Sequence, residues 1–189
     1  MSIAEDIDLV QALRTRVATL EAENTSLRAK LDLFEQHSTL AKGIKGERII
    51  VTLLGGTPSA KNAPHDIELK ERDLLLEVKY ANLNLAVPHS ATQRWVWSKI
   101  FGEAGKKNYQ RLILVGDIDL RYRESYMDSD SPYVLFDIPY EDAVPLTIKT
   151  GRYRSISLTT NPAKAKSAGA PLFGKYQITF QDLESRYGL

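Results

Sequence analysis

The sequence contains no cysteine and only three histidines, His37, His65 and His89. Without cysteine there are no disulfides and no thiolate metal sites, and histidines this far apart do not suggest a zinc site. No stretch approaches the roughly 20 apolar residues of a membrane span. Nor does an apolar run follow a basic N-terminal segment, as it would in a secretory signal. These absences favour a cytoplasmic protein with no membrane partner.

Internal repeats and a glycine-rich nucleotide-binding loop are also missing from the sequence. The pair Gly55-Gly56 instead reads as a turn that ends a helix predicted for Lys45–Leu54. The 189 residues, 43% of them hydrophobic, suffice for one globular domain of about 150 residues behind a helical stalk. We therefore predict a helix over residues 1–38 and a domain over residues 39–189.

The N-terminal part repeats apolar residues at alternating intervals of three and four, which is the a/d heptad of a coiled coil. β-Branched residues at a and leucine at d favour two parallel helices, and Asn24 at an a position specifies register and a dimer. The alternative is a single amphipathic helix packed on its own domain, although such helices usually have a wider apolar stripe. The a positions are Val10, Val17, Asn24 and Leu31, and the d positions are Leu13, Leu20, Leu27 and Phe34.

Charges around this seam support a homodimer and exclude one class of zipper protein. In a parallel pair, each g residue meets an e residue of the partner, and the resulting pairs all attract. The segment before the heptads is acidic, whereas a basic-region zipper protein needs a basic helix there to enter the major groove. The zipper is therefore expected to join subunits and not to read DNA. The attracting pairs are Arg16–Glu21, Glu23–Arg28 and Lys30–Glu35.

Two alternating segments, 64–69 and 74–80, predict a β-hairpin with residues 70–73 as its loop. If Leu69 pairs with Leu74, then Asp66 lies opposite Glu77, with Cβ atoms roughly 5 Å apart. Lys79 shares their face. Two opposed carboxylates are the oxygen ligands that Mg²⁺ takes, with water and substrate phosphate completing its coordination. The alternative is an amphipathic hairpin with a solvated polar face.

This arrangement resembles the PD-(D/E)xK signature of the restriction-endonuclease-like nuclease superfamily, over roughly residues 43–120. Ten residues separate Asp66 from Glu77-Val78-Lys79, and Glu47 matches an acidic residue that many members carry upstream. A helix expected from about Ala91 to Asn108 and a buried strand at Arg111–Asp117 continue the order. His65 departs from the pattern, since it separates the proline from Asp66.

The resemblance implies an α/β domain with a mixed central sheet flanked by helices, and a Mg²⁺-dependent endonuclease that leaves a 5′-phosphate on DNA. Asp66, Glu77 and the Val78 carbonyl would then hold the metal. Lys79 would orient the attacking water and stabilise negative charge. Glu47 would contribute through water or by orienting Lys79, or else is an exposed glutamate that suits its helix dipole.

Basic residues are unevenly distributed in a chain whose net charge is only +1. The span 143–181 contains no acidic residue, and such a segment suits contact with the DNA backbone, although charge runs are often only solvated loops. Its candidates for DNA contact are Lys149, Arg152, Arg154, Lys164 and Lys166.

Further candidates for DNA contact flank the hairpin. Lys61 and Asn62 precede Asp66, while Gln93 and Arg94 fall on the helix expected after it. Trp95 and Trp97 could stack on bases, but buried aromatics are commoner, and one of the two is expected in the core.

Together these features predict a homodimeric, Mg²⁺-dependent DNA endonuclease, with a type II restriction enzyme as the first interpretation. A Holliday-junction resolvase or repair nickase of the same fold stays open, because both can be dimeric. A non-catalytic DNA-binding or assembly protein is the alternative from a different class, although a binder has no need of Asp66, Glu77 and Lys79.

Overall fold

A computed structural model describes residues 11, 13–21, 24–25, 38–60, 63–85, 93–102, 105–165 and 171–188. The chain divides into two units, residues 1–41 and 42–189. In these described ranges, no helix is long and apolar enough to cross a membrane.

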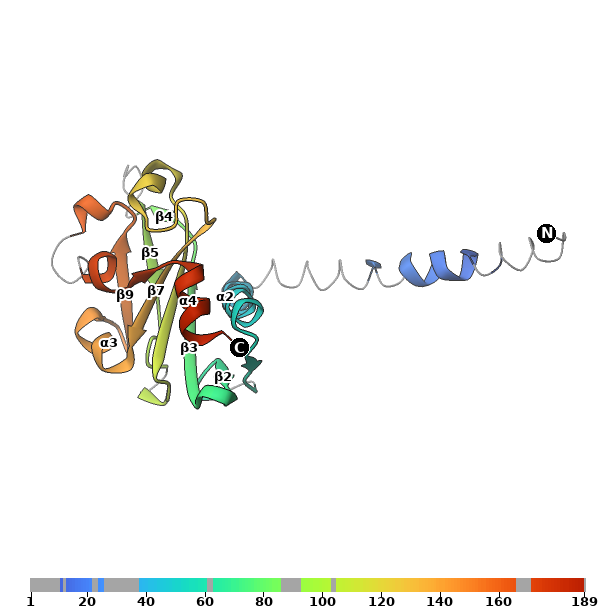
Figure 1. The fold of residues 1–189 in the computed structure, drawn as a ribbon, viewed down its shortest axis with the longest axis horizontal. Coiled ribbons are helices and arrows are strands. Elements are labelled where there is room, and N and C mark those ends of the chain that lie inside the picture. Colours follow the sequence, from blue (N-terminus) through green and yellow to red (C-terminus); the bar gives the residue numbers. More distant parts are fainter. Residues whose placement is uncertain are drawn as a thin grey trace. The chain divides into compact units, whose positions relative to one another are not determined.

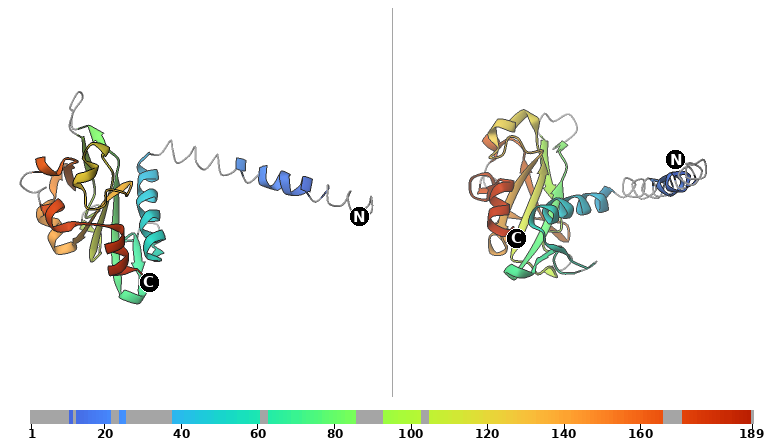
Figure 2. Two further views of the ribbon diagram at one scale, coloured as in Figure 1. Left: turned by 45° about the horizontal axis from the view of Figure 1, so that its top comes forward. Right: turned by 45° about the vertical axis from the view of Figure 1, so that its right-hand side comes forward.

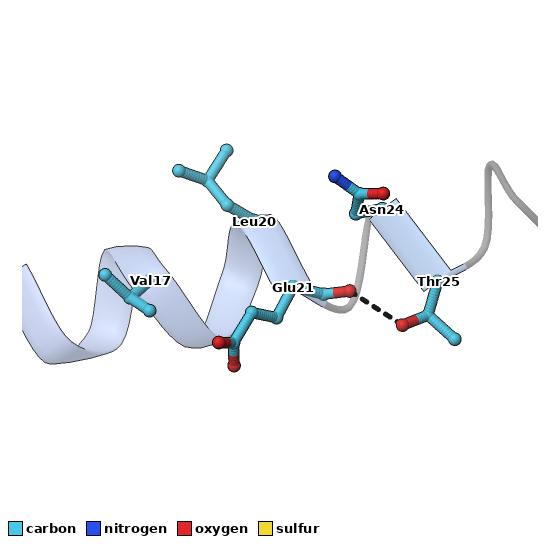
Figure 3. A pocket seen from close by; sticks show the side chains of 5 residues that line it. All are labelled: Val17, Leu20, Glu21, Asn24 and Thr25. Atoms are coloured by element: carbon cyan, nitrogen blue, oxygen red, sulfur yellow. Dashed lines mark hydrogen bonds between the residues drawn. The ribbon is translucent and has the colours of Figure 1, made fainter.

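The first unit is helical at every described position before residue 26, namely 11, 13–21 and 24–25. The hydroxyl of Thr25 donates to the Glu21 carbonyl one turn back at 2.9 Å, as expected inside an α-helix. Leu20 and Asn24 project to the same side of this helix, while Glu21 and Thr25 lie elsewhere on it (Figure 3). Leu13, Val17 and Leu20 are all exposed in the single chain. The predicted seam residues Val10, Leu27, Leu31 and Phe34, and the charged residues Glu23, Arg28, Lys30 and Glu35, lie outside the described residues.

Helix α2 (Ser38–Leu54) contains the helix predicted for Lys45–Leu54. Ile50 and Leu54, one turn apart, are both buried. The helix ends before Gly55, whose φ of +69° is the left-handed conformation that glycine adopts most easily after a helix. Gly46 lets α2 approach the sheet, because a Cβ there would lie 2.8 Å from the Tyr80 Cβ. The predicted helix and its terminating turn are confirmed.

The central sheet is mixed and has six strands in the order β1-β2-β3-β6-β7-β10. Only β3 and β6 pair in parallel, and the other neighbours are antiparallel. The predicted mixed sheet and the buried strand at residues 111–117 are therefore confirmed. The strands are β1 (Thr57–Pro58), β2 (Ile67–Leu69), β3 (Leu74–Ala81), β6 (Arg111–Asp117), β7 (Tyr133–Pro139) and β10 (Gln177–Ile178).

A second sheet replaces the helix that the sequence predicted for residues 91–108, so that prediction is wrong. Trp95 and Trp97 alternate with exposed Val96, as the period of a strand requires, and both indoles are buried. Their N–H groups donate to carbonyls of β6, at 2.8 Å to Asp117 and 2.9 Å to Val115. One of the two tryptophans was expected in the core, and both are there. The sheet runs β4 (Asn84–Leu85), β5 (Gln93–Trp97), β9 (Tyr153–Thr159) and β8 (Ile148–Thr150).

Two apolar cores lie on opposite faces of the central sheet (Figures 1 and 2). One lies beneath α2 and α4 (Phe180–Tyr187), which contribute Ile50 and Leu183. The other lies beneath the second sheet and α3 (Tyr140–Leu146), which contributes Ala143. Shorter helical segments are the 3₁₀ turns Lys70–Arg72, Leu120–Ser125 and Pro162–Lys164, and a π-helical turn at Leu172–Tyr176.

Candidate active site

The β2–β3 hairpin places Asp66 beside Glu77 in the register that the sequence predicts. Leu69 pairs with Leu74, and the Asp66 N–H donates to the Leu76 carbonyl at 2.9 Å. The loop 70–73 is a 3₁₀ turn closed by Asp73, whose φ of +50° turns the chain back into β3. A four-residue loop therefore fixes which residues of the two strands face each other.

Two hairpin residues, Val78 and Lys79, contact the Asp66 carboxylate. The Val78 N–H donates to Asp66 Oδ2 at 3.0 Å, and Lys79 Nζ lies 3.5 Å from the same oxygen. Lys79 also donates to Glu77 Oε1 and, at 3.3 Å, to the Val78 carbonyl. The predicted metal ligands Asp66, Glu77 and Val78 thus share one small cluster with the predicted catalytic lysine.

A second lysine, Lys107, joins the cluster from the segment between β5 and β6. Its Nζ lies 3.0 Å from Asp66 Oδ1 and 2.8 Å from Glu77 Oε2, so its ammonium bridges both carboxylates. The neighbouring Asn108 N–H donates to the Pro64 carbonyl at 2.8 Å and ties this segment to the start of the hairpin. Lys107 is not among the predicted site residues, because it falls within the helix predicted for residues 91–108. The basic pair Lys106-Lys107 just before a buried strand was the available signal.

Burial explains the electrostatics of the two carboxylates. Glu77 is 0% exposed, and burial raises its pKa because desolvation disfavours the charged form. Burial would also raise the pKa of Asp66, but Lys79, Lys107 and the Val78 N–H together lower it. For Lys107, burial favours the neutral form, yet its contacts with Glu77 and Asp66 raise its pKa. Both carboxylates are therefore held between two ammonium groups.

Glu47 faces this cluster from helix α2. Burial raises the pKa of Glu47, and the negative charge of Asp66 raises it further, against the opposing charges of Lys79 and Lys107. The structure therefore brings Asp66 and Glu77 into contact with Lys79. The charges of Asp66, Lys79 and Lys107 affect the pKa of Glu47, but no hydrogen bond or ion pair between described residues joins Glu47 to them. Three acids and two lysines leave the group with an excess of negative charge.

The donor set suits a hard divalent cation. Two carboxylates and the Val78 carbonyl supply protein oxygens, and Mg²⁺ commonly takes one or two carboxylates and leaves its remaining positions to water and phosphate. Buried Glu77 Oε2 has the Lys107 ammonium, 2.8 Å away, as its partner among the described residues. Within the described part of the chain, no three His, Cys, Asp or Glu side chains form a metal-binding group. Two carboxylates plus a carbonyl nevertheless fit a Mg²⁺ ion that shares its coordination with substrate.

The predicted DNA-contacting residues near the hairpin are only partly placed. Lys61, Asn62 and Lys166 lie outside the described residues. Gln93 and Arg94 lie on β5 and not on the predicted helix, because this segment pairs with β4 and β9. No hydrogen bond or ion pair between described residues joins either one to the Asp66–Glu77 cluster.

The predicted basic residues of the 143–181 span are exposed. Lys149 and Arg154 pair across the β8–β9 hairpin, and Arg152 lies in its turn. Lys164 lies on an exposed 3₁₀ turn. Arg152 and Arg154 also border a pocket whose other lining residues are Phe101, Gly102, Gly105, Tyr140 and Val144. Because the segment from Gly102 to Gly105 leads directly to Lys107, this pocket adjoins the stretch of chain that carries the second lysine.

No protein-family model matches the chain, and no curated protein matches its sequence.

Proposed function

We propose that the protein is a Mg²⁺-dependent endonuclease of the restriction-endonuclease-like fold that hydrolyses phosphodiester bonds in DNA. The observation that carries the proposal is the pair of carboxylates, Asp66 directly before β2 and Glu77 on the adjacent strand β3, with the Lys79 ammonium in contact with both. A buried glutamate beside a second acid is costly to keep in a fold unless cations offset it. In a site that cleaves phosphodiester bonds, such a pair can hold the metal ion.

In this proposal each residue of the cluster has a separate task. Asp66, Glu77 and the Val78 carbonyl hold the cation, which when bound polarises the scissile phosphate and lowers the pKa of a water. Lys79, already directed at these acceptors, donates to the attacking water and offsets the negative charge that develops on the phosphate. Glu47 orients the Lys79 ammonium through its charge, consistent with the electrostatic coupling between them.

We further propose that the N-terminal helix forms a parallel coiled coil that joins two catalytic domains. Exposed Leu13, Val17 and Leu20 support this, because apolar residues at a and d positions gain most when a second helix covers them. Two linked sites suit cleavage of both strands, as in a type II restriction enzyme. A resolvase or a repair nickase is the variant of this proposal that the substrate test separates.

The exposed residues of the β8–β9 hairpin are proposed to contact the DNA backbone. Lys149, Arg152 and Arg154 together place three positive charges on one hairpin, and phosphate contacts of this kind supply most of the non-specific affinity for DNA. Lys164 extends the same basic span. Lys61, Asn62, Gln93, Arg94 and Lys166 remain predictions for the same role.

The test of cleavage incubates the full-length protein and Mg²⁺ with supercoiled plasmid and with branched DNA. Wild type is expected to cut, whereas Lys79→Ala and an EDTA-treated sample are not. Lys70→Ala is the matched control, since this exposed lysine lies in the loop of the same hairpin. Discrete linear fragments favour the restriction enzyme, and junction-selective cutting favours a resolvase. Binding of DNA with no cleavage of any substrate would instead support a non-catalytic DNA-binding protein.

The test of assembly measures molar mass by sedimentation equilibrium. Wild type is expected at twice the chain mass, and Leu20→Glu at a d position is expected to shift it toward the monomer. Thr15→Glu adds the same charge at an f position, outside the seam, and should leave the dimer intact. Equal masses for the two variants would reject the coiled coil.

A further inference from the structure

Lys107 places its ammonium on the oxygens that the proposed function assigns to a metal. The Nζ atom contacts Asp66 Oδ1 at 3.0 Å and Glu77 Oε2 at 2.8 Å. The Lys107 ammonium therefore bridges one oxygen of each carboxylate, while Lys79 contacts the other oxygen of each.

The partners of the two lysines differ. Lys79 contacts both carboxylates and also the Val78 carbonyl. The ion pairs and hydrogen bonds of the Lys107 ammonium to described residues all go to Asp66 and Glu77, the same groups that a divalent cation would use. Binding such a cation thus removes both of the carboxylate partners of Lys107.

Electrostatic repulsion makes it unfavourable for the Lys107 ammonium and a divalent cation to contact the two carboxylates at the same time. Two positive groups about 3 to 4 Å apart repel by several kcal/mol even at the effective dielectric constant of a protein surface. The lysine ammonium is a compact charge on a flexible four-carbon stem, so it can leave the carboxylates without a change in the backbone. The Lys107 side chain is 21% exposed, which gives it a route toward solvent and substrate.

We propose that Lys107 is a resident cation of the site. Without a divalent ion, its ammonium neutralises Asp66 and Glu77 and so stabilises the fold around them. It also competes with the ion for their oxygens. Once displaced, its ammonium contacts the substrate phosphate beside the same carboxylates. This inference rests on the proposed function.

The first experiment titrates Ca²⁺ into the full-length protein by calorimetry, because Ca²⁺ binding can be measured without turnover. Lys107→Met is expected to bind Ca²⁺ about tenfold or more tightly than wild type, since the competing charge is gone. Lys106→Met is the matched control, because it removes a charge from the adjacent exposed residue, and Asp66→Asn should abolish binding. Equal tightening in Lys106→Met would show a general effect of nearby charge and would overturn the inference.

The second experiment uses wild-type protein alone and so does not depend on a variant that folds. An amine-reactive reagent is applied with and without Ca²⁺, and labelling of each lysine is measured by mass spectrometry. Lys107 is expected to react several-fold faster with Ca²⁺ present, while Lys106 is unchanged. Labelling of Lys107 that stays constant or falls as Ca²⁺ binds would overturn the inference.

The outcomes separate this inference from the proposed function. If wild type binds Ca²⁺ and Lys107→Met binds it equally or more weakly, the role of Lys107 falls while the nuclease proposal stands. If neither wild type nor Lys107→Met binds Ca²⁺ or Mg²⁺, the metal-dependent function itself is rejected, and Lys107 with it.

Discussion

Two clusters of buried charge lie on opposite faces of the central sheet and are built in different ways. Glu77 pairs in register with Leu112, which belongs to the core beneath the second sheet. Asp137 pairs with Ile113, which belongs to the core beneath α2 and α4. The same sheet therefore carries one buried acid in each of its two cores.

The Asp137 cluster has one acid with a full set of donors. Arg111 contacts both oxygens, at 2.8 Å from Nε and 2.7 Å from Nη2, which is the paired geometry that a guanidinium favours. Arg186 and the Tyr187 hydroxyl, at 3.2 Å and 2.9 Å, bring α4 to the same carboxylate. These contacts hold the C-terminal helix α4 against the sheet.

The Asp66–Glu77 cluster has the opposite character. Two acids lie side by side, a third is close by on α2, and both partners are lysines and not arginines. Ammonium groups exchange partners more easily than a paired guanidinium does. The comparison teaches that burial of charge alone does not mark a functional site. Several acids close together, with partners that can exchange, indicate a functional site better than a single acid with fixed partners does.

The largest expected effect comes from breaking the structural cluster. Asp137→Ala leaves Arg111 and Arg186 without their shared carboxylate, and removing one partner of a buried pair typically costs about 3–5 kcal/mol. Denaturant titration should show that loss in the free energy of unfolding. Asp130→Ala, at an exposed position, should change it by less than about 0.5 kcal/mol. A small effect in Asp137→Ala would remove the contrast between the clusters.

The opposite pattern is expected for Glu77→Gln. Cleavage of DNA should fall by at least about 100-fold, as is usual when a group that stabilises a transition state is lost. The free energy of unfolding should change less than in Asp137→Ala, because Asp66 still contacts both lysines. Glu71→Gln in the exposed hairpin loop is the control for both measurements. Full activity in Glu77→Gln would show that this cluster, too, is only structural.

A smaller effect is expected from the N-terminus of α4, which carries Arg186 and Tyr187. Thr179 and Asp182 form a capping box there: the Asp182 N–H donates to Thr179 Oγ1 at 3.0 Å, and the Thr179 N–H donates to the Asp182 carboxylate. Thr179→Ala should lower the free energy of unfolding by about 1 kcal/mol. Thr179→Ser keeps the hydroxyl and should restore most of it. Neither change should alter Ca²⁺ binding, and a change there would mean that the two faces are coupled.

The smallest effect is the contribution of Tyr187, in the Asp137 cluster, to the loss of stability at alkaline pH. Burial, and then the charge of Asp137, raise the pKa of Tyr187 to about 12, from about 10 in an unfolded chain. Between these values the unfolded chain loses the phenolic proton first, so the free energy of unfolding falls as pH rises from about 10 to 12. Denaturant titrations over this range should show a shallower fall in Tyr187→Phe. An equal slope in both proteins would assign the alkaline loss to other groups.

Sequence alone was enough for the local parts of the site. The β2–β3 register follows from two alternating segments and a four-residue loop, so Asp66, Glu77, Val78 and Lys79 could be brought together from neighbouring positions. Helix α2 followed from its apolar spacing and the glycine after it, and β6 from its continuous apolar run. The coiled-coil seam is equally legible in sequence and stays a prediction.

Only the tertiary structure decided the rest. Residues 93–97 form a strand because Trp95 and Trp97 are buried against β6, and periodicity in so short a segment does not reveal its partner. Because β3 and β6 are parallel, the chain must return from the end of β3 to the level of its start before β6 begins. Lys107 lies near the end of this connection, and it therefore reaches Glu77. Asp137 meets Arg186 across 49 residues because β10 pairs with β7 and leads into α4. Contacts within a hairpin depend on local geometry, whereas contacts between distant segments depend on which strands pair.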